Sequence, residues 1–241
     1  MEYNVKNLIG FTMGATDGEF GKVEDFYFDD ETWTIRYLVV RTGGWLSGRK
    51  VLISPAALSG TDTAHKSFPV NLSKEQIRHS PDIDTEKIVS REQEIELYRH
   101  YAWPFEIDSG AGFYGGMGMM GMTNSRLPLE DAIFLSKEDH ESGATHSHLR
   151  STSEIKAYSI HATDGAIGEA EDFIIDKDGW AIKYLVIDTG NWLPGKEVVI
   201  SPEWISKIEW AYSSVYVNLS KEAVKNSTGY DSSLPLQEES Y

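Results

Sequence analysis

The sequence contains no cysteine, which excludes disulfide bonds, thiolate catalysis and zinc sites with cysteine ligands. Basic residues are also few, since 22 Lys and Arg stand against 38 Asp and Glu and give a formal net charge of −16. Because a phosphate backbone is bound by a basic face, we expect no nucleic-acid partner. The negative charge is spread along all 241 residues, which is typical of a solvated acidic surface.

Long hydrophobic runs are absent as well. The longest apolar stretches, around residues 37–40 and 184–187, are far shorter than the roughly 20 residues of a membrane-spanning helix. We therefore expect no integral membrane segment. The N-terminal sequence MEYNVKNLIG lacks the basic start and the apolar stretch of a secretion signal, so the sequence predicts a cytoplasmic location.

What the chain does contain is the same unit twice. The segment that begins at Ala15 aligns without a gap with the segment that begins at Ala162, and about half of the paired positions are identical. The offset of 147 (162 minus 15) carries through to the VNLSKE motifs at Val70 and Val217. We call these units, each with the segment that leads into it, the first and the second copy. Because the units of a solenoid abut and come in longer arrays, two copies with a long spacer predict that each copy folds alone.

Within each copy the pattern is that of strands and turns. Asp17-Gly18 and Asp164-Gly165 predict tight turns, since Gly accepts a positive φ without steric cost. Strands are expected at 23–28, 33–40, 170–175 and 180–187. Pro55 and Pro202 cannot donate to a ladder, so each ends a further strand. The sequence therefore predicts a mainly β fold of two small antiparallel β-barrels in tandem, with short accessory helices.

Helices are expected beside the barrels. Ser73 and Ser90 each stand three residues before a Gln, which is the spacing of a capping box. The second box opens the segment REQEIELYRHYAW, in which residues 95, 98 and 101 are apolar and lie along one side. The second copy keeps Ser220 but has Ala223 at the third position, so the copies differ outside the barrels.

The expected domains are a first barrel with its C-terminal helix at 1–108, a flexible Gly/Met-rich and polar linker at 109–148, and a second barrel at 149–241. An adhesive segment that docks on a partner is the alternative interpretation of the linker's methionines.

The repeated residues resemble the PRC-barrel family. The resemblance rests first on a pattern of Gly, then Val or Ala, then Asp, whose last residue is Asp25 in the first copy and Asp172 in the second. It rests also on the YLVV and YLVI strands and on ISP followed by VNLSKE. The segment REQEIELYRHYAWPF also resembles the tail of many bacterial members. The family takes its name from the cytoplasmic domain of the photosynthetic reaction-centre H subunit, and a related barrel occurs in a ribosome maturation factor.

This resemblance covers about 85 residues of each copy. It implies a small, mostly antiparallel β-barrel that serves as an assembly or adaptor module, and it implies no catalytic residue. The reaction-centre subunit has a membrane helix before its barrel, and the ribosome factor has a different N-terminal domain. Neither specific role transfers to this chain.

One triplet invites a catalytic interpretation. Asp188-Thr189-Gly190 matches the aspartic-protease motif, in which two such loops share one proton between two carboxylates. The first copy has Arg41-Thr42-Gly43 at the same place, so the second acid is missing and the triplet predicts only a turn after a buried strand. Phosphate-binding loops, dinucleotide fingerprints and the other common catalytic motifs are absent. We therefore predict no enzyme activity, no catalytic residue and no cofactor.

Carboxylates recur at four positions of both copies, and clustered carboxylates are the ligands that calcium prefers. The pairs are Asp17 with Asp164, Glu24 with Glu171, Asp25 with Asp172, and Asp29 with Asp176. Their spacing does not match an EF-hand, and Asp at turn positions bonds its local backbone without a metal.

Asp25 and Asp172 differ from the other acids because each stands inside a strand between apolar neighbours. Such an acid must face solvent, an interface or an internal partner, and we expect structural pairing with Arg36 or Lys183 on a neighbouring strand. Histidines gather near the spacer, where they have no scaffold to fix metal geometry. We predict no metal site; the nearest candidates for ligands are Asp25, Asp172, His146 and His148.

Trp45 and Trp192 occupy matching Gly-rich loops, and a Trp held in such a loop is suited to binding a partner. The candidate interaction residues are Trp45, Leu46, Trp192 and Leu193. Packing across a barrel end or between barrels is the alternative. Trp33 and Trp180, at strand starts, favour the core.

The sequence as a whole predicts a non-catalytic adaptor. Its two barrels mediate protein–protein interaction, pair with each other or across a homodimer, and present acidic and aromatic surface to a protein partner that the sequence does not name. The alternative is a small-ligand or metal-ion binding protein that uses a barrel mouth or the cleft between barrels.

Overall fold

The computed structural model describes residues 2–83, 89–103, 148–190 and 197–226. The chain divides into two compact units, one made of residues 1–71 and 148–241 and one made of residues 72–147. The sheets of both copies belong to the first unit. Of the expected linker at 109–148, only His148 lies within the described residues, and the expected domain boundaries stay a prediction.

The first copy forms a sheet with the strand order β5-β4-β3-β2-β6. Its strands are β2 (Thr12–Ala15), β3 (Gly18–Asp29), β4 (Thr34–Thr42), β5 (Lys50–Ile53) and β6 (Ser67–Pro69). Strands β2 and β3 form the predicted hairpin, in which Gly18 has a φ of 121°. Strand β5 ends just before Pro55, as its lack of a donor predicted.

The second copy repeats this sheet with the order β11-β10-β9-β8-β13-β12. Its strands are β8 (Ser159–Ala162), β9 (Gly165–Asp176), β10 (Ile182–Asp188), β11 (Glu197–Ile200), β12 (Ile205–Glu209) and β13 (Ser214–Val217). The prediction of a mainly β fold is confirmed. It needs one correction, because each copy contains one parallel pair, β2 with β6 and β8 with β13. As described, neither strand order closes into a ring.

Short helical elements flank the strands. They are η1 (Gly44–Leu46), η2 (Pro55–Ala57), η3 (Pro202–Trp204), η4 (Trp210–Tyr212) and α6 (Lys221–Asn226). In the second unit, α2 (Lys74–Arg78) and α3 (Arg91–Tyr101) both begin with the predicted capping boxes, at Ser73 and Ser90. The predicted apolar side of α3 is buried, since residues 95, 98 and 101 are at most 7% exposed.

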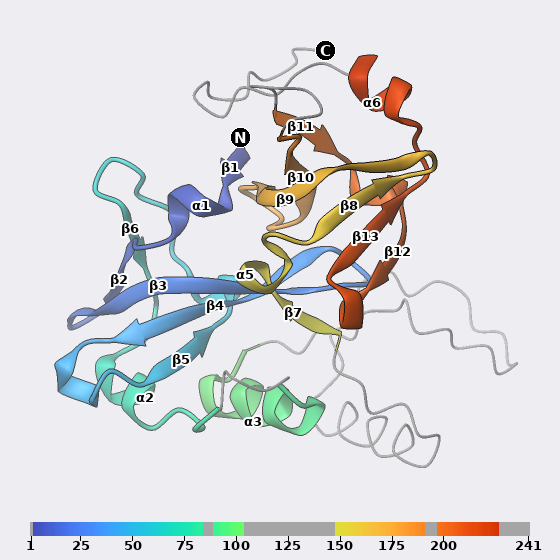
Figure 1. Cartoon of the computed structure of the whole chain (residues 1–241). Coiled ribbons are helices and arrows are strands. Elements are labelled where there is room, and N and C mark those ends of the chain that lie inside the picture. The colour runs from blue at the N-terminus through green and yellow to red at the C-terminus, as the bar shows by residue number, and fades with distance from the viewer. Residues whose placement is uncertain (1, 84–88, 104–147, 191–196, 227–241) are drawn as a thin grey trace, which may run out of the picture. The chain divides into compact units, whose positions relative to one another are not determined.

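The remaining elements cross between the copies (Figure 1). Strand β1 (Glu2–Asn4) pairs antiparallel with β9 of the second copy, and β7 (Leu149–Ser151) pairs antiparallel with β3 of the first copy. Each of these strands leads into a helical turn, α1 (Val5–Leu8) or α5 (Thr152–Ile155). We call this arrangement, in which β1–α1 and β7–α5 each pair with the other copy, the exchange seam.

The exchange is reciprocal, and the two halves correspond residue by residue. Adding the repeat offset of 147 converts the bounds of β1 and α1 into those of β7 and α5. The same offset relates the two pairings, because Leu149 with Asp29 in the first copy's sheet corresponds to Glu2 with Asp176 in the second copy's sheet. The two copies therefore form one unit with approximate two-fold symmetry.

Candidate functional site at the exchange seam

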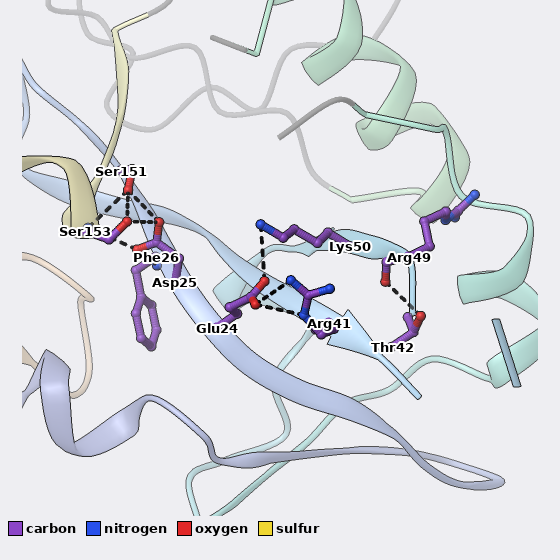
Figure 2. A network of polar contacts seen from close by, with 9 residues as sticks. All are labelled: Glu24, Asp25, Phe26, Arg41, Thr42, Arg49, Lys50, Ser151 and Ser153. Atoms are coloured by element: carbon purple, nitrogen blue, oxygen red, sulfur yellow. Dashed lines mark hydrogen bonds and ion pairs between the residues drawn. The ribbon is translucent and has the colours of Figure 1, made fainter. Parts of the chain in front are cut away.

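Asp25 accepts five hydrogen bonds, one from the neighbouring Phe26 N–H and four from the second copy (Figure 2). It receives hydrogen bonds from the Ser151 hydroxyl, from Thr152 Oγ1 at 2.9 Å, and from both Oγ (2.9 Å) and the backbone N–H (3.2 Å) of Ser153. Ser151 also accepts from two N–H groups at the start of α5. Asp25 therefore fixes both the strand and the first turn of the helix that the second copy contributes.

The equivalent acid of the second copy, Asp172, accepts fewer hydrogen bonds from the other copy than Asp25 does. Its Oδ1 accepts from the backbone N–H of Lys6 at 2.9 Å, which matches the bond from Ser153 N–H to Asp25 in the other half of the seam. Its side chain is fully buried, and Oδ2 has no hydrogen-bond partner among the described residues. Burial raises the pKa of Asp172 above its ordinary value, although hydrogen bonds from Phe173 and Lys6 oppose the shift.

The difference between the two acids follows from three substitutions between the copies. Where the second copy offers hydroxyls at Ser151, Thr152 and Ser153, the first copy has Asn4, Val5 and Lys6. Thr152 and Val5 are both buried and have the same shape, so that position differs only in the hydroxyl. The seam is thus symmetric in its backbone and asymmetric in its side chains.

The sequence left solvent, an interface or an internal partner open for Asp25 and Asp172, and the favoured pairing with Arg36 or Lys183 is wrong. The hydrogen bonds come from the start of the other copy's first helix and not from Arg36 or Lys183 on a neighbouring strand. Local reasoning missed this because the donors lie more than 120 residues away in the chain.

Two tryptophans tie the copies together beside the strands. The backbone N–H of Ile35 donates to the carbonyl of Trp180 at 2.9 Å, and the N–H of Ile182 donates to the carbonyl of Trp33 at 2.7 Å. Both Trp residues have a positive φ, 53° and 56°, which non-Gly residues rarely adopt. The Trp180 ring lies 5.9 Å from the ring of Phe68 in the first copy, but Trp33 and Trp180 are both half-buried, so the core placement expected for them is only partly met.

A charged cluster on the first copy's sheet has no equivalent in the second copy. Glu24 forms ion pairs with Arg41 at 2.7 Å and with Lys50 at 3.3 Å (Figure 2). Burial opposes the ionisation of Glu24, but hydrogen bonds from both basic residues outweigh it and lower the pKa of Glu24. The second copy has the acids Glu171, Asp188 and Glu197 at these positions. This face is therefore more acidic on the second copy.

The other predicted acids lie in turns. Asp29 accepts from the N–H groups of Glu31 and Thr32, and Asp176 accepts from Gly179 N–H, so the prediction of local backbone bonding is confirmed for both. Asp188 accepts from Gly190 N–H at 2.8 Å, which is the turn expected instead of a protease loop.

Within the described residues, no group of three or more His, Asp or Glu side chains is placed to hold a metal ion. His148 bonds Asp30 Oδ1 at 3.0 Å, whereas His146 lies outside the described residues. The alternative prediction of ligand binding remains a prediction.

Among the predicted interaction residues, Trp45 is half-buried in η1, and its Nε1–H donates to the carbonyl of Phe20 at 2.9 Å. That bond anchors the loop to the sheet. Leu46 is also half-buried. Trp192 and Leu193 lie outside the described residues. A contact role for these four residues stays a prediction.

An exposed aromatic pair on the second copy was missed in the sequence. Trp204 is 42% exposed and Tyr212 is 77% exposed, on either side of the edge strand β12. The equivalent residues of the first copy are Ala57 and His65, in a segment where only two isolated bridges replace the strand, as far as it is described. Comparing the copies for differences, instead of for shared residues, would have found this pair.

Comparison with known proteins agrees with the fold. No described helix has the length and apolar character needed to cross a membrane. A protein of Deinococcus radiodurans, named only as an uncharacterized protein, is 24% identical over 228 residues, which are 88% of this chain and 73% of that protein. The family model of the PRC-barrel domain matches residues 1–77, which include β1 to β6. Residues 1–77 of this chain are therefore similar to a PRC-barrel domain.

Proposed function

We propose that this protein is a non-catalytic adaptor in which two PRC-type modules, held together at the exchange seam, present a docking surface to another protein. The observation that carries the proposal is the exposed pair Trp204 and Tyr212 on the second copy's edge hairpin. Most large apolar side chains of the described core are buried, which makes an aromatic pair on one edge a candidate for a contact surface.

The surroundings of this pair suit protein binding. Strand β12 is the last strand of its sheet, and its Ser206 and Lys207 are exposed, so its outer edge offers backbone groups beside two large rings. The formal charge of −16 favours a partner with a basic surface. Together these features describe a basic polypeptide that lays an extended segment along β12.

The proposal keeps two finer expectations from the sequence, a cytoplasmic location and a homodimer. Exposed sheet edges and similar copies support self-association. Light scattering of the full chain tests this expectation, since a mass that stays monomeric at every concentration contradicts it.

The adaptor role is tested with a matched pair of baits. The double variant Trp204→Ala/Tyr212→Ala removes both rings, whereas His65→Ala changes the first-copy position equivalent to Tyr212. We expect proteins captured by the unmodified chain and by His65→Ala to be lost from the double variant. For each purified partner, the dissociation constant should rise at least about tenfold, as for a central aromatic contact. Equal affinity for the unmodified chain and the double variant would show that this surface is not the docking site.

A further inference from the structure

We propose that the exchange seam is a recognition interface in its own right. The surface of β3 around Asp25 binds the strand–helix segment β7–α5 of the second copy even when the spacer no longer joins the two copies. The feature recognised is a strand followed by hydroxyl side chains at the first turn of a helix. This inference rests on contacts inside the chain and does not depend on the adaptor role.

The backbone pairing at the seam has the symmetry expected of two separate molecules that form a dimer. Each copy contributes a three-residue strand and takes one in return, in the same register and with the same cap from an acid in the long strand. An isologous dimer has this pattern, with contact i to j repeated as j to i. Two independent barrels joined by a spacer would not need to exchange strands in this reciprocal way.

The two copies also share apolar contacts that their separation would expose. The ring centroids of Phe28 and Phe173 lie 5.7 Å apart, and those of Phe26 and Trp180 lie 6.4 Å apart. The three Phe side chains are fully buried. Since removing an aromatic ring from water is favourable, this contact stabilises the paired state.

Recognition is concentrated at Asp25. That half of the seam offers four hydrogen bonds from the second copy to one carboxylate, whereas Asp172 receives one from the first copy and keeps a buried oxygen without a described partner. Because hydrogen bonds to a charged group are stronger than neutral ones, the Asp25 half determines which segment binds.

The test uses the full chain with the recognition site of a specific protease inserted after Gly121. After cleavage under native conditions, the two fragments should elute together as a one-to-one complex at micromolar concentration. Fragments that separate, as expected if each copy folds alone, would overturn the proposal, and so would precipitation of the cut protein.

The role of Asp25 is tested in the same cut chain. Asp25→Ala should raise the dissociation constant of the two fragments at least about tenfold, because it removes charge-assisted hydrogen bonds between them. The matched control is Asp164→Ala, which removes a carboxylate that accepts from Lys221 N–H within the second copy and should leave the constant unchanged. Should Asp25→Ala fail to fold, Thr152→Val removes one of the same bonds and gives the second copy the residue found at Val5. Equal dissociation constants for a seam variant and the control would contradict the proposed site.

Discussion

Replacing Asp25 by Ala should destabilise the intact chain by about 2–4 kcal/mol. The carboxylate accepts four hydrogen bonds from residues 151–153. Each hydrogen bond to a charged group contributes about 1.5–3 kcal/mol, but the four share one half-buried acceptor and part of their strength is lost to solvent. The expected loss is therefore well below the sum of four separate bonds, and it is measured as the shift of the urea midpoint multiplied by the m-value.

The equivalent change at the other half of the seam is the control. Asp172→Ala removes one bond from the first copy, to Lys6 N–H, and also removes a buried charge with an oxygen that has no described partner. These effects oppose each other, so the loss should be smaller than at Asp25. A loss of less than about 1 kcal/mol at Asp25, or equal losses at both positions, would refute the reasoning from hydrogen bonds.

A double-mutant cycle separates the energy of the hydrogen bond between Thr152 and Asp25 from the other effects of each substitution. Thr152→Val keeps the shape of a buried side chain and deletes the hydroxyl that bonds Asp25. Combined with Asp25→Ala, it should show a coupling energy of about 1 kcal/mol, since the two side chains touch. Additive losses would show that Asp25 stabilises the seam through other groups.

Two further predictions concern single positions. Because burial raises the folded-state pKa of Asp172 above its unfolded value, this group favours the folded chain more as pH falls through the raised pKa and less as pH rises. Asp172→Asn should therefore reduce the pH dependence of the urea midpoint in the range just above the ordinary pKa of an Asp carboxyl, and an unchanged profile would contradict this. Gly168→Ala should destabilise by about 3 kcal/mol or more in the same assay, since its Cβ would lie 2.1 Å from the Asp188 carbonyl oxygen, whereas Gly44→Ala, with no atom within 4 Å of its Cβ, should change the midpoint little.

Much of the local structure could be predicted from residue types. The Asp-Gly turns, the strand ends before Pro55 and Pro202, and both capping boxes depend on neighbours within a few positions, and all of them are present. The unusual position of Asp25 and Asp172 was also visible, because each acid stands among apolar residues of a strand.

The partner itself could not be predicted, because β3 and β9 have nearly the same pattern. A local pattern cannot decide whether β1 pairs with the strand of its own copy or with that of the other copy, since both satisfy the same alternation. The aromatic pair on the second copy was missed for a different reason. A comparison that looked for shared residues gave no weight to Trp204, which replaces Ala57.

The sequence by itself determined the duplication, the mainly β class, the turns and the unusual position of two acids inside strands. These depend on interactions between near neighbours, which a linear pattern records. Only the tertiary structure decided that the copies trade their first strands, that hydroxyls of the second copy bond Asp25, and that Asp172 is buried with one oxygen without a described partner. Those features join residues more than 120 positions apart, and long-range pairing is fixed by the packing of the whole chain.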